Sequence, residues 1–465
     1  MEKNLSKNTK ERKIYLVYIL LFAIFVFKMY FYSNQEYTVP DSRAQLSYLI
    51  YMEKNSDVFV PKFEDITMYK TTATYMEGNE RIDRMEPYTS TCYLGHPPLY
   101  YKIMQLCDTV EVDENAVAYV NYTKLANCNI VLTALTMILI LMTGYYLLRE
   151  KQRDWSMHLF FATIATTLPL YGYVGSGLNN DNLCNLGVAV FWLGLITYLK
   201  KGYSYQTFWF VGLGIAITMM GKLTAGLIVV VATVIMILAD IIKTKKLGII
   251  CNKYFLSSLP VYAGVLLYYL KIYMTYGGVQ PAYSQISSIE EFKSSGFYVE
   301  EANRIELTFA EIVERFFSGV WQTWKATYNS DYMVEREGIL SIAYAVVLTL
   351  FVGYAIYELV RFIKEKGKNN QLITFAFFAA IIVTMVTHFK TFYSGYISRG
   401  YLGANQARYY MACIPVIAFA ACEGADLIKQ RIGVKLCKYS KVVLVLLSVS
   451  LVYSDFIHYV LNIHR

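Results

Sequence analysis

Two aspartates in this sequence stand where a carboxylate could accept a proton. Asp41 follows Pro40 and precedes Ser42–Ile50, a segment whose pattern predicts a helix lying along a membrane surface. Asp181 stands in the polar turn Asn179-Asn180-Asp181-Asn182. Each also has a structural explanation, because Asp is a favoured helix N-cap and turns rich in Asn and Asp are common. A residue can be both a cap and a general base, so Asp41 and Asp181 are both candidate catalytic residues. Asp181 either orients the substrate or only shapes its turn.

Three basic residues, Lys222, Arg399 and Arg408, fall on the predicted outer side of a membrane, where Lys and Arg are normally scarce. Arg408, in Gln406-Ala407-Arg408-Tyr409-Tyr410, stands where a predicted span enters the bilayer. Its side chain can snorkel to the interface or bind a phosphate through paired, charge-assisted hydrogen bonds. The three cations and Tyr409 are therefore candidate substrate-binding residues.

A histidine precedes a Pro-Pro step in His96-Pro97-Pro98-Leu99-Tyr100-Tyr101. Proline is tolerated in the first helical turn, where its missing N–H has no intrahelical partner. The motif therefore predicts a rigid helix start, and a lone histidine at such a place is usually structural.

The eight cysteines show no CxxC or other metal-ligand spacing. Cys92 and Cys107 lie in the same predicted loop, so they either form a disulfide or stay as two unpaired thiols. The sequence alone does not decide between these alternatives, because it cannot place their Cα atoms within bridging distance.

The composition identifies the elements that must position these residues as membrane helices. The chain is 56% hydrophobic and only 17% charged, against about a quarter charged in soluble domains, and its apolar residues come in membrane-length blocks. The net charge of +8 needs no nucleic-acid partner, because Lys and Arg cluster beside the spans. We predict an all-α, multi-pass plasma-membrane protein whose N-terminus is cytoplasmic.

Alternating Lys and Arg clusters predict about eleven spans and an outer C-terminus. A cytoplasmic N-terminus (1–13) precedes a first span (14–33), a long outer loop (34–126) that we expect to carry the catalytic site, and a bundle of six spans (127–274). A second outer loop (275–336) and four further spans (337–465) follow. Basic residues flank both ends of 205–242, so parity requires two short spans that meet near Gly221-Lys222. The spans are expected at 14–33, 127–148, 156–174, 183–199, two within 205–242, 254–273, 339–360, 372–388, 409–428 and 442–460.

In the second outer loop, Leu307–Trp324 has apolar residues at helical spacing. An amphipathic helix at the membrane interface fits this pattern, and so does a helix packed on the spans by its apolar face.

The order of these motifs resembles the GT-C superfamily, integral-membrane glycosyltransferases such as protein O-mannosyltransferases and lipid A aminoarabinose transferases. An acid after the first span, a Pro-Pro-Leu-Tyr-Tyr segment in the first outer loop and an Asn-Asp turn after the third span carry the resemblance. The turn 177–182, the step Gly221-Lys222 and the segment 406–409 are similar to a broad set of bacterial membrane proteins expected to share this fold. The resemblance covers most of residues 1–225 and the tenth span.

Two departures from the family pattern stand out. In the lipid A transferases a Lys commonly precedes the Pro-Pro pair and lies at the lipid phosphate, whereas His96 stands there in this chain. The bacterial set often has Pro-Asp-Glu in the first loop, whereas this chain has Pro40-Asp41-Ser42. The second acid of a metal-binding pair is therefore missing. We predict no metal ligands, and a divalent cation is the one cofactor left open.

The resemblance implies a sugar transfer on the outer face of the membrane. The donor would be a polyprenyl-phosphate-linked sugar in the membrane lipid, and the acceptor an envelope glycan, lipid or protein. Asp41 would be the general base, and His96, Lys222 and Arg408 would stabilise the departing phosphate. A single displacement would invert the anomeric configuration.

Two other classes stay open: a transporter or flippase of lipid-linked sugars, and a non-catalytic subunit of an envelope-polymer assembly. In a transporter, Glu423, Asp426 and Asp455 would couple ions. The structural alternative for Glu423 and Asp426 is pairing with Lys429 and Arg431.

Overall fold

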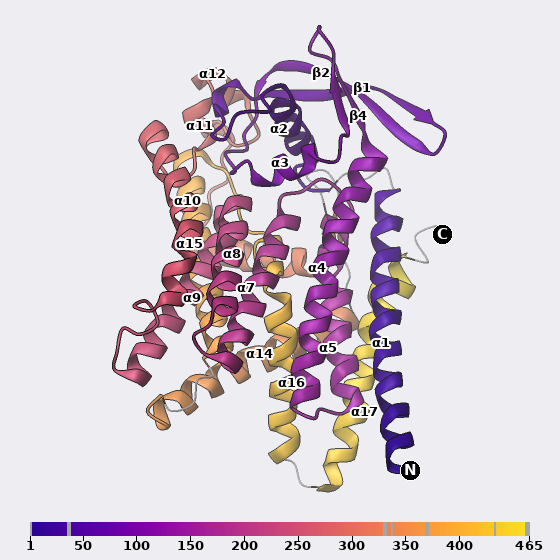
Figure 1. Ribbon diagram of the computed structural model, residues 1–465. Coiled ribbons are helices and arrows are strands. Elements are labelled where there is room, and N and C mark those ends of the chain that lie inside the picture. Colours follow the sequence, from indigo (N-terminus) through magenta and orange to yellow (C-terminus); the bar gives the residue numbers. More distant parts are fainter. Residues whose placement is uncertain are drawn as a thin grey trace.

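A computed structural model describes residues 2–34, 39–328, 333–335, 338–367, 372–431 and 434–460. Long helices stand side by side, and a small β-sheet with two short helices covers one end of the bundle (Figure 1). We call this the sheet end and the opposite one the far end. Within those ranges, nine helices are long and apolar enough to cross a membrane. The chain is therefore a multi-pass membrane protein; the count of eleven spans stays a prediction, and an outer C-terminus falls on 461–465, outside the described residues.

The long helices follow the expected order along the chain. They are α1 (Glu2–Ser33), α4 (Tyr122–Glu150), α7 (Asp181–Lys201), α8 (Tyr205–Gly221), α9 (Leu223–Thr244), α10 (Lys253–Tyr276), α14 (Ile339–Lys364), α15 (Ile373–Arg399), α16 (Ile414–Arg431) and α17 (Val434–Val452), which continues as the π-helix η5 (Tyr453–Val460). Helices α8 and α9 meet at Lys222, as the charge pattern requires.

The expected third span, 156–174, is not one helix. Pro169 lacks an N–H, and the chain breaks there into α5 (Trp155–Thr167) and α6 (Pro169–Gly175). The carbonyl of Thr166, in the last turn of α5, accepts a hydrogen bond of 3.0 Å from Lys28 Nζ of α1. Lys28 also lies 2.5 Å from Asp455, with side chains 1% and 2% exposed. A buried ion pair thus supports the break.

The first loop carries a sheet that the sequence analysis did not predict. It is antiparallel, in the order β1-β2-β4-β3, with β1 (Thr67–Glu77), β2 (Glu80–Thr91), β3 (Val110–Val112) and β4 (Ala118–Asn121). Glu77 pairs with Glu80 across a tight turn in which Gly78 has φ 61°, a conformation that glycine adopts without strain. Met85 and Val120 face inward and join the buried cluster beneath the sheet.

The remaining short elements lie mostly at the sheet end. Helices α2 (Ser42–Lys54) and α3 (Leu99–Gln105) lie under the sheet. Their rings Tyr48 and Tyr101 pack against each other in the same cluster, with centroids 3.8 Å apart and planes tilted by 44°. The others are α11 (Tyr283–Ile286), α12 (Ile289–Ser294), α13 (Phe309–Trp324), the pair β5 (Ala326–Tyr328) and β6 (Met333–Glu335), and the 3-10 turns η1 (Phe63–Asp65), η2 (Glu301–Asn303), η3 (Ala407–Tyr409) and η4 (Met411–Cys413).

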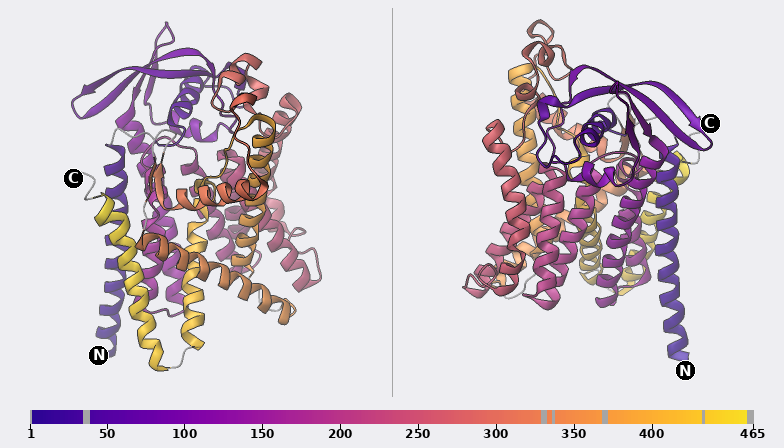
Figure 2. Two further views of the ribbon diagram at one scale, coloured as in Figure 1. Left: turned by 180° about the vertical axis from the view of Figure 1, so that it is seen from behind. Right: turned by 45° about the horizontal axis from the view of Figure 1, so that its top comes forward.

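Helix α13 crosses the bundle instead of running along it (Figure 2, left). Ile312, Phe316 and Val320 on its apolar face are buried, and Phe316 packs on Phe389 and Phe392 of α15. The apolar face is therefore packed on the protein, which is the second of the two arrangements expected for Leu307–Trp324.

At the far end, the acids of α16 pair with other partners than expected. Glu423 binds Lys151 at 2.5 Å and Arg153 at 3.1 Å, and Asp426 also pairs with Arg153. Lys429 instead binds Asp154 at 2.8 Å. Glu423 and Asp426 are therefore paired, but the expected partners Lys429 and Arg431 are wrong, because the α4–α5 turn brings Lys151 and Arg153 onto this face of α16.

Candidate functional site

The carboxylate of Asp41 does not cap the helix that it precedes. Asp41 occupies the N-cap position of α2, but its φ is 60° and its side chain makes no capping hydrogen bond. The left-handed conformation is uncommon for a residue other than glycine, although Asp tolerates it. It leaves the carboxylate free of the helix end and directed at partners elsewhere in the fold.

Those partners are Tyr93 and Arg408. Tyr93 Oη donates a hydrogen bond of 2.8 Å to Asp41 Oδ1, and Arg408 Nη2 lies 2.6 Å from Asp41 Oδ2. The Arg408 side chain is 6% exposed and that of Asp41 24% exposed, so the acid keeps the more open position. Arg408 is thus buried against a carboxylate and does not snorkel to the interface.

Opposing effects act on the pKa of Asp41. Burial by itself raises the pKa, but the positive charges of Arg408 and Lys222 and the hydrogen bonds from Tyr93 and Arg408 outweigh it and lower the pKa to about 2. Asp41 is therefore ionised at neutral pH. While this ion pair persists, Asp41 is a weak base, because basicity falls with pKa.

The second acid forms a matching pair with Lys222. Asp181 is the first residue of α7, and its Oδ1 lies 2.7 Å from Lys222 Nζ, with side chains 4% and 5% exposed. Within the described part of the chain, Asp181 Oδ2 is buried without a hydrogen-bond partner. Lys222 is the residue between α8 and α9 and has an extended backbone, which removes it from both helices and lets its side chain reach α7.

The asparagines of the turn before α7 join several elements around this pair. Asn179 Nδ2 donates to the carbonyl of Pro40 at 2.8 Å, beside Asp41. Asn180 Nδ2 donates to the carbonyl of Gly221 at 3.0 Å, beside Lys222. Asn182 Nδ2 donates to Asn129 Oδ1 of α4 at 3.0 Å. The turn therefore sets the distance between the two ion pairs.

Tyr409 lies between the two cations. Lys222 Nζ is 5.0 Å from its ring centroid and the Arg408 guanidinium is 5.4 Å away, both within cation–π range. The His388 ring of α15 packs on Tyr409 with centroids 4.7 Å apart, and its Nδ1 is 2.8 Å from Tyr410 Oη. The cation of each ion pair thus lies within cation–π range of the same ring.

His96 joins the site as a neutral imidazole. Its burial lowers the pKa to about 3, assisted by Lys222 and Arg408 and opposed by Asp41, so His96 carries no charge at neutral pH. Its Nδ1 lies 3.4 Å from Gln280 Nε2 of the second loop. His96 can therefore offer a hydrogen bond but not the positive charge that a Lys would bring.

The second loop covers the site. Tyr93, which holds Asp41, packs on Phe297 at 4.9 Å between ring centroids. A Cβ atom on Gly95 would come within 2.5 Å of the carbonyl oxygen of Pro281, so only glycine permits this close approach. Gln280 and Phe297 therefore cover His96 and Tyr93.

Arg399 lies at the edge of the site. Its guanidinium is 5.9 Å from the Phe292 ring and 5.5 Å from the Tyr401 ring. Burial raises the pKa of Tyr401, and Asp41, Arg399 and Arg408 are all close enough to influence it. Arg399 is thus held among aromatic rings. The two ion pairs bring together the other predicted residues: Asp41, His96, Asp181, Lys222, Arg408 and Tyr409.

Next to Lys222 is an apolar groove of about 380 Å³ between α8, α9 and α10. Met219 and Leu223, on either side of Lys222 in the sequence, line its end nearest the site, and Val230, Val234 and Leu266 continue it along the helices. These helices are membrane-length or nearly so. Met219 and Leu223 bring the groove close to Lys222 along the chain, but none of the candidate site residues lines it.

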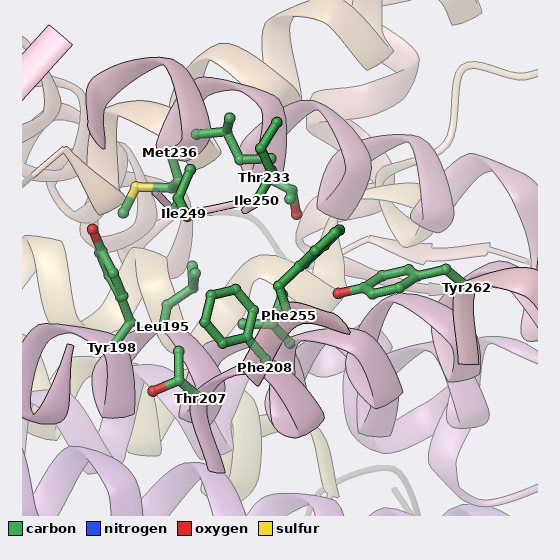
Figure 3. Close-up of a pocket in the computed structure, with 12 residues that line it drawn as sticks. Leu195, Tyr198, Thr207, Phe208, Thr233, Met236, Ile249, Ile250, Phe255 and Tyr262 are labelled. Carbon is green, nitrogen blue, oxygen red and sulfur yellow. The ribbon is translucent and has the colours of Figure 1, made fainter. Parts of the chain in front are cut away.

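A separate, smaller cavity lies between α7, α8, α9 and α10. It holds about 50 Å³ and is lined by apolar side chains such as Leu195, Phe208 and Phe255 and by a few hydroxyls, including that of Tyr198 (Figure 3). None of the candidate site residues is among its lining, and it has neither the charge nor the volume for a sugar phosphate.

Two residues of the site were not predicted from the sequence. His388 could have been suspected, because an ionisable residue inside a span is often functional. Tyr93 had no such signal.

In the described ranges, no three His, Cys, Asp or Glu side chains come together to hold a metal ion. Cys92 and Cys107 are both unpaired, and Cys92 is fully buried with its thiol on the carbonyl of Ala44.

Comparison with known proteins adds no assignment: no protein-family model matches this chain, and no curated protein matches it either.

Proposed function

We propose that this protein is a GT-C-type glycosyltransferase that moves a sugar from a polyprenyl-phosphate donor to an acceptor of the cell envelope on the outer face of the plasma membrane. The observation that carries the proposal is the ion pair between Asp41 and Arg408. Asp41 stands at a helix start but does not cap the helix. Its ion pair with the buried Arg408 places a potential base next to a potential phosphate site.

The two halves of that pair have successive tasks. A donor phosphate competes with Asp41 for Arg408, because the arginine fork binds both groups in the same way. Once Arg408 turns to the phosphate, Asp41 loses its largest charge partner and its pKa rises. The donor thereby makes Asp41 a stronger base only when it is in place.

The sugar is then transferred in one displacement step. The acceptor hydroxyl or amine attacks the anomeric carbon of the sugar and gives its proton to Asp41. The bond between that carbon and the phosphate oxygen breaks on the opposite side, and polyprenyl phosphate leaves with the electron pair. Arg408 and Lys222 stabilise the charge of the departing phosphate, and inversion of the anomeric carbon follows from the single displacement.

The groove between α8, α9 and α10 suits the lipid part of the donor. Its lining is almost wholly apolar, and it ends at Met219 and Leu223 on either side of Lys222. An isoprenoid chain lying in it would present its phosphate to Lys222 and, across Tyr409, to Arg408.

The test is transfer in proteoliposomes that contain the purified protein, a polyprenyl-phosphate donor with a radiolabelled sugar, and an envelope fraction as acceptor. We expect a labelled product that has the opposite anomeric configuration to the donor. Asp41→Asn protein should bind the donor and make little product. Donor binding with neither transfer nor movement of the lipid would instead indicate a non-catalytic subunit and overturn the proposal.

One observation favours a second candidate, a flippase of lipid-linked sugars. Lys28 and Asp455 form a buried pair between α1 and η5, and buried ionisable groups in membrane helices often mark ion-coupled transport. A flippase would move labelled donor between leaflets without an acceptor, and Asp455→Asn would slow that movement. A transferase would move sugar only when the acceptor is present.

A further inference from the structure

Tyr93 connects the carboxylate of Asp41 to the second loop. Its hydroxyl donates the 2.8 Å hydrogen bond to Asp41 Oδ1. Its ring packs on those of Phe297 and Tyr283, with centroids 4.9 and 6.4 Å away, and both belong to the segment that follows α10 in the chain. The candidate base is therefore held by a residue of the first loop whose own position depends on the second loop.

The chain just before Tyr93 is fixed at two points. Cys92 N donates to the carbonyl of Ile66 at 2.6 Å. Thr91 donates through both its backbone N–H and its hydroxyl to the carboxylate of Glu291, the hydroxyl at 3.2 Å. Glu291 lies in α12 of the second loop. These contacts hold Tyr93 in one place while the second loop covers the site.

The two carboxylate oxygens of Asp41 have different partners. Oδ1 accepts from Tyr93, whereas Oδ2 lies 2.6 Å from Arg408 Nη2. The carboxylate makes no capping hydrogen bond to α2 that would fix it independently of these two residues. Loss of Arg408 therefore frees Oδ2 and leaves Oδ1 bound to Tyr93.

We infer that Tyr93 positions Asp41 for proton transfer: it holds Oδ1 while Oδ2, released by Arg408, accepts the proton of the acceptor. The inference rests on the proposed function, in which the donor phosphate draws Arg408 away from Asp41. A lone pair of the acceptor atom forms the bond to the anomeric carbon. The O–H or N–H bond of the acceptor breaks, its electron pair stays on that atom, and the proton binds Oδ2. Tyr93 keeps its own proton and is a positioning residue.

A tyrosine suits this task because it remains a hydrogen-bond donor. Burial, and then the negative charge of Asp41, raise the pKa of Tyr93 well above its usual value of 10.0, so the phenol is protonated at neutral pH. A neutral donor orients the carboxylate without the full positive charge of an arginine, which would lower its basicity further. Without Tyr93, the released carboxylate could rotate toward Lys222, whose positive charge already acts on it.

The hydrogen bond from Tyr93 also sets the direction of a pH effect. It favours the ionised form of Asp41, so its removal raises the pKa of Asp41. Two cations and four other titratable groups also lie near Asp41: Arg408, Lys222, Cys92, His96, Tyr101 and Tyr401. Burial lowers the pKa of His96 to about 3 and raises those of the thiol and the two phenols, so none of these four changes its charge between about pH 4 and 7.

Tyr93→Phe tests the inference, because it removes the hydroxyl and keeps the ring that packs on Phe297. The full-length protein is placed in proteoliposomes with polyprenyl phosphate that carries no sugar, and the protonation of Asp41 is followed by infrared spectroscopy. The carboxyl band that is missing in Asp41→Asn identifies Asp41. We expect protonation of Asp41 about one pH unit higher in Tyr93→Phe than in wild type.

The same variant is then measured in the transfer assay with radiolabelled donor and envelope fraction. The acid limb of kcat should move upward by the same amount, and the plateau of kcat should fall about tenfold because the base is no longer oriented. KM for the donor should not change, since Arg408 and Lys222 remain.

Tyr276→Phe is the matched control. Tyr276, the last residue of α10, donates to Glu64 Oε2 at 2.7 Å, so this variant also removes a hydrogen bond between a tyrosine and a carboxylate at the sheet end. It should change neither the titration of Asp41 nor kcat.

Three results would overturn the role of Tyr93. If kcat falls but neither the titration of Asp41 nor the acid limb moves, Tyr93 acts only through the fold. If wild-type protein transfers sugar, Asp41→Asn does not, and Tyr93→Phe behaves as wild type in both measurements, the role of Tyr93 is refuted and the proposed function stands. If wild-type protein transfers no sugar, the proposed function fails and the role of Tyr93 fails with it.

Discussion

Replacing Asp41 by Asn tests the mechanism most directly, because it keeps the size of the side chain and removes its charge. The structure shows that Asp41 does not cap α2 through its side chain, so the loss of a cap cannot explain an effect. The substitution removes the ion pair with Arg408 at 2.6 Å and the capacity to accept a proton. We expect turnover to fall by about 10²–10⁴-fold, with donor binding retained.

The effect on stability follows from the pKa. The pKa of Asp41 is lowered from 3.8 to about 2, which corresponds to about 2 kcal/mol of stabilisation of the folded state by the ionised form. For a lowered carboxyl pKa, this contribution is fully present above pH 4 or so and is lost as the pH falls toward 2. At neutral pH the Asn variant should therefore unfold about 2 kcal/mol more easily, and the difference should vanish in strong acid.

The assay compares turnover in proteoliposomes with the unfolding temperature in detergent. Asp83→Asn is the matched control, because Asp83 is also buried and paired with an arginine, Arg81, at 2.8 Å, but lies in the sheet. It should lower stability without reducing turnover of the folded protein. Asp41→Asn protein that works within about threefold of wild type would refute Asp41 as the base, since a general base contributes far more.

Four further predictions concern the rest of the site. Arg408→Lys keeps the charge but loses the planar fork, so KM for the lipid donor should rise about tenfold with a smaller change in kcat in steady-state assays; an unchanged KM would exclude Arg408 from the phosphate site. Because the pKa of His96 is about 3, kcat/KM should show no titration of this residue between pH 5 and 8, and His96→Lys should remain active; an acid limb near pH 6.5 that disappears in His96→Gln would contradict this. Lys222→Met should destabilise the protein by about 3–5 kcal/mol, because it leaves Asp181 buried and charged. Adding Asp181→Leu should restore the unfolding temperature but not the activity. If Lys222→Met alone is as stable as wild type, the buried pair is disproved. Leu223→Trp should fill the groove beside Lys222 and raise KM for long-chain but not short-chain donors, and an equal effect on both would exclude the groove as the lipid site.

Part of this architecture was predictable because membrane insertion depends on local sequence. Apolar runs and the placement of Lys and Arg are sufficient to identify helices of bilayer length, and the structure contains them. The same logic predicted that α8 and α9 meet at Lys222, since two basic clusters on one side require an even number of crossings. The break at Pro169 follows from its missing N–H, although 156–174 was expected to be one continuous span.

The sheet in the first loop was predictable in principle but was not predicted. Its first strand, 67–77, is rich in Thr and Tyr, which favour strands, and the Gly78-Asn79 step favours a tight hairpin turn. The pairing of β2 with β4 joins segments that are distant in the chain, and no local pattern in the sequence encodes such a pairing.

The sequence by itself determined which side chains are available at the site and that Asp41, Asp181 and Lys222 would share one end of the bundle, because the parity of crossings assigns each turn to an end. Only the tertiary structure decided their partners. It turned the Asp41 carboxylate from its helix to Arg408, left Arg399 at the edge of the site and buried Cys92 against α2, away from Cys107. These contacts depend on how the helices pack and rotate against one another, and that is set by the side chains of the whole buried interface and not by any single segment.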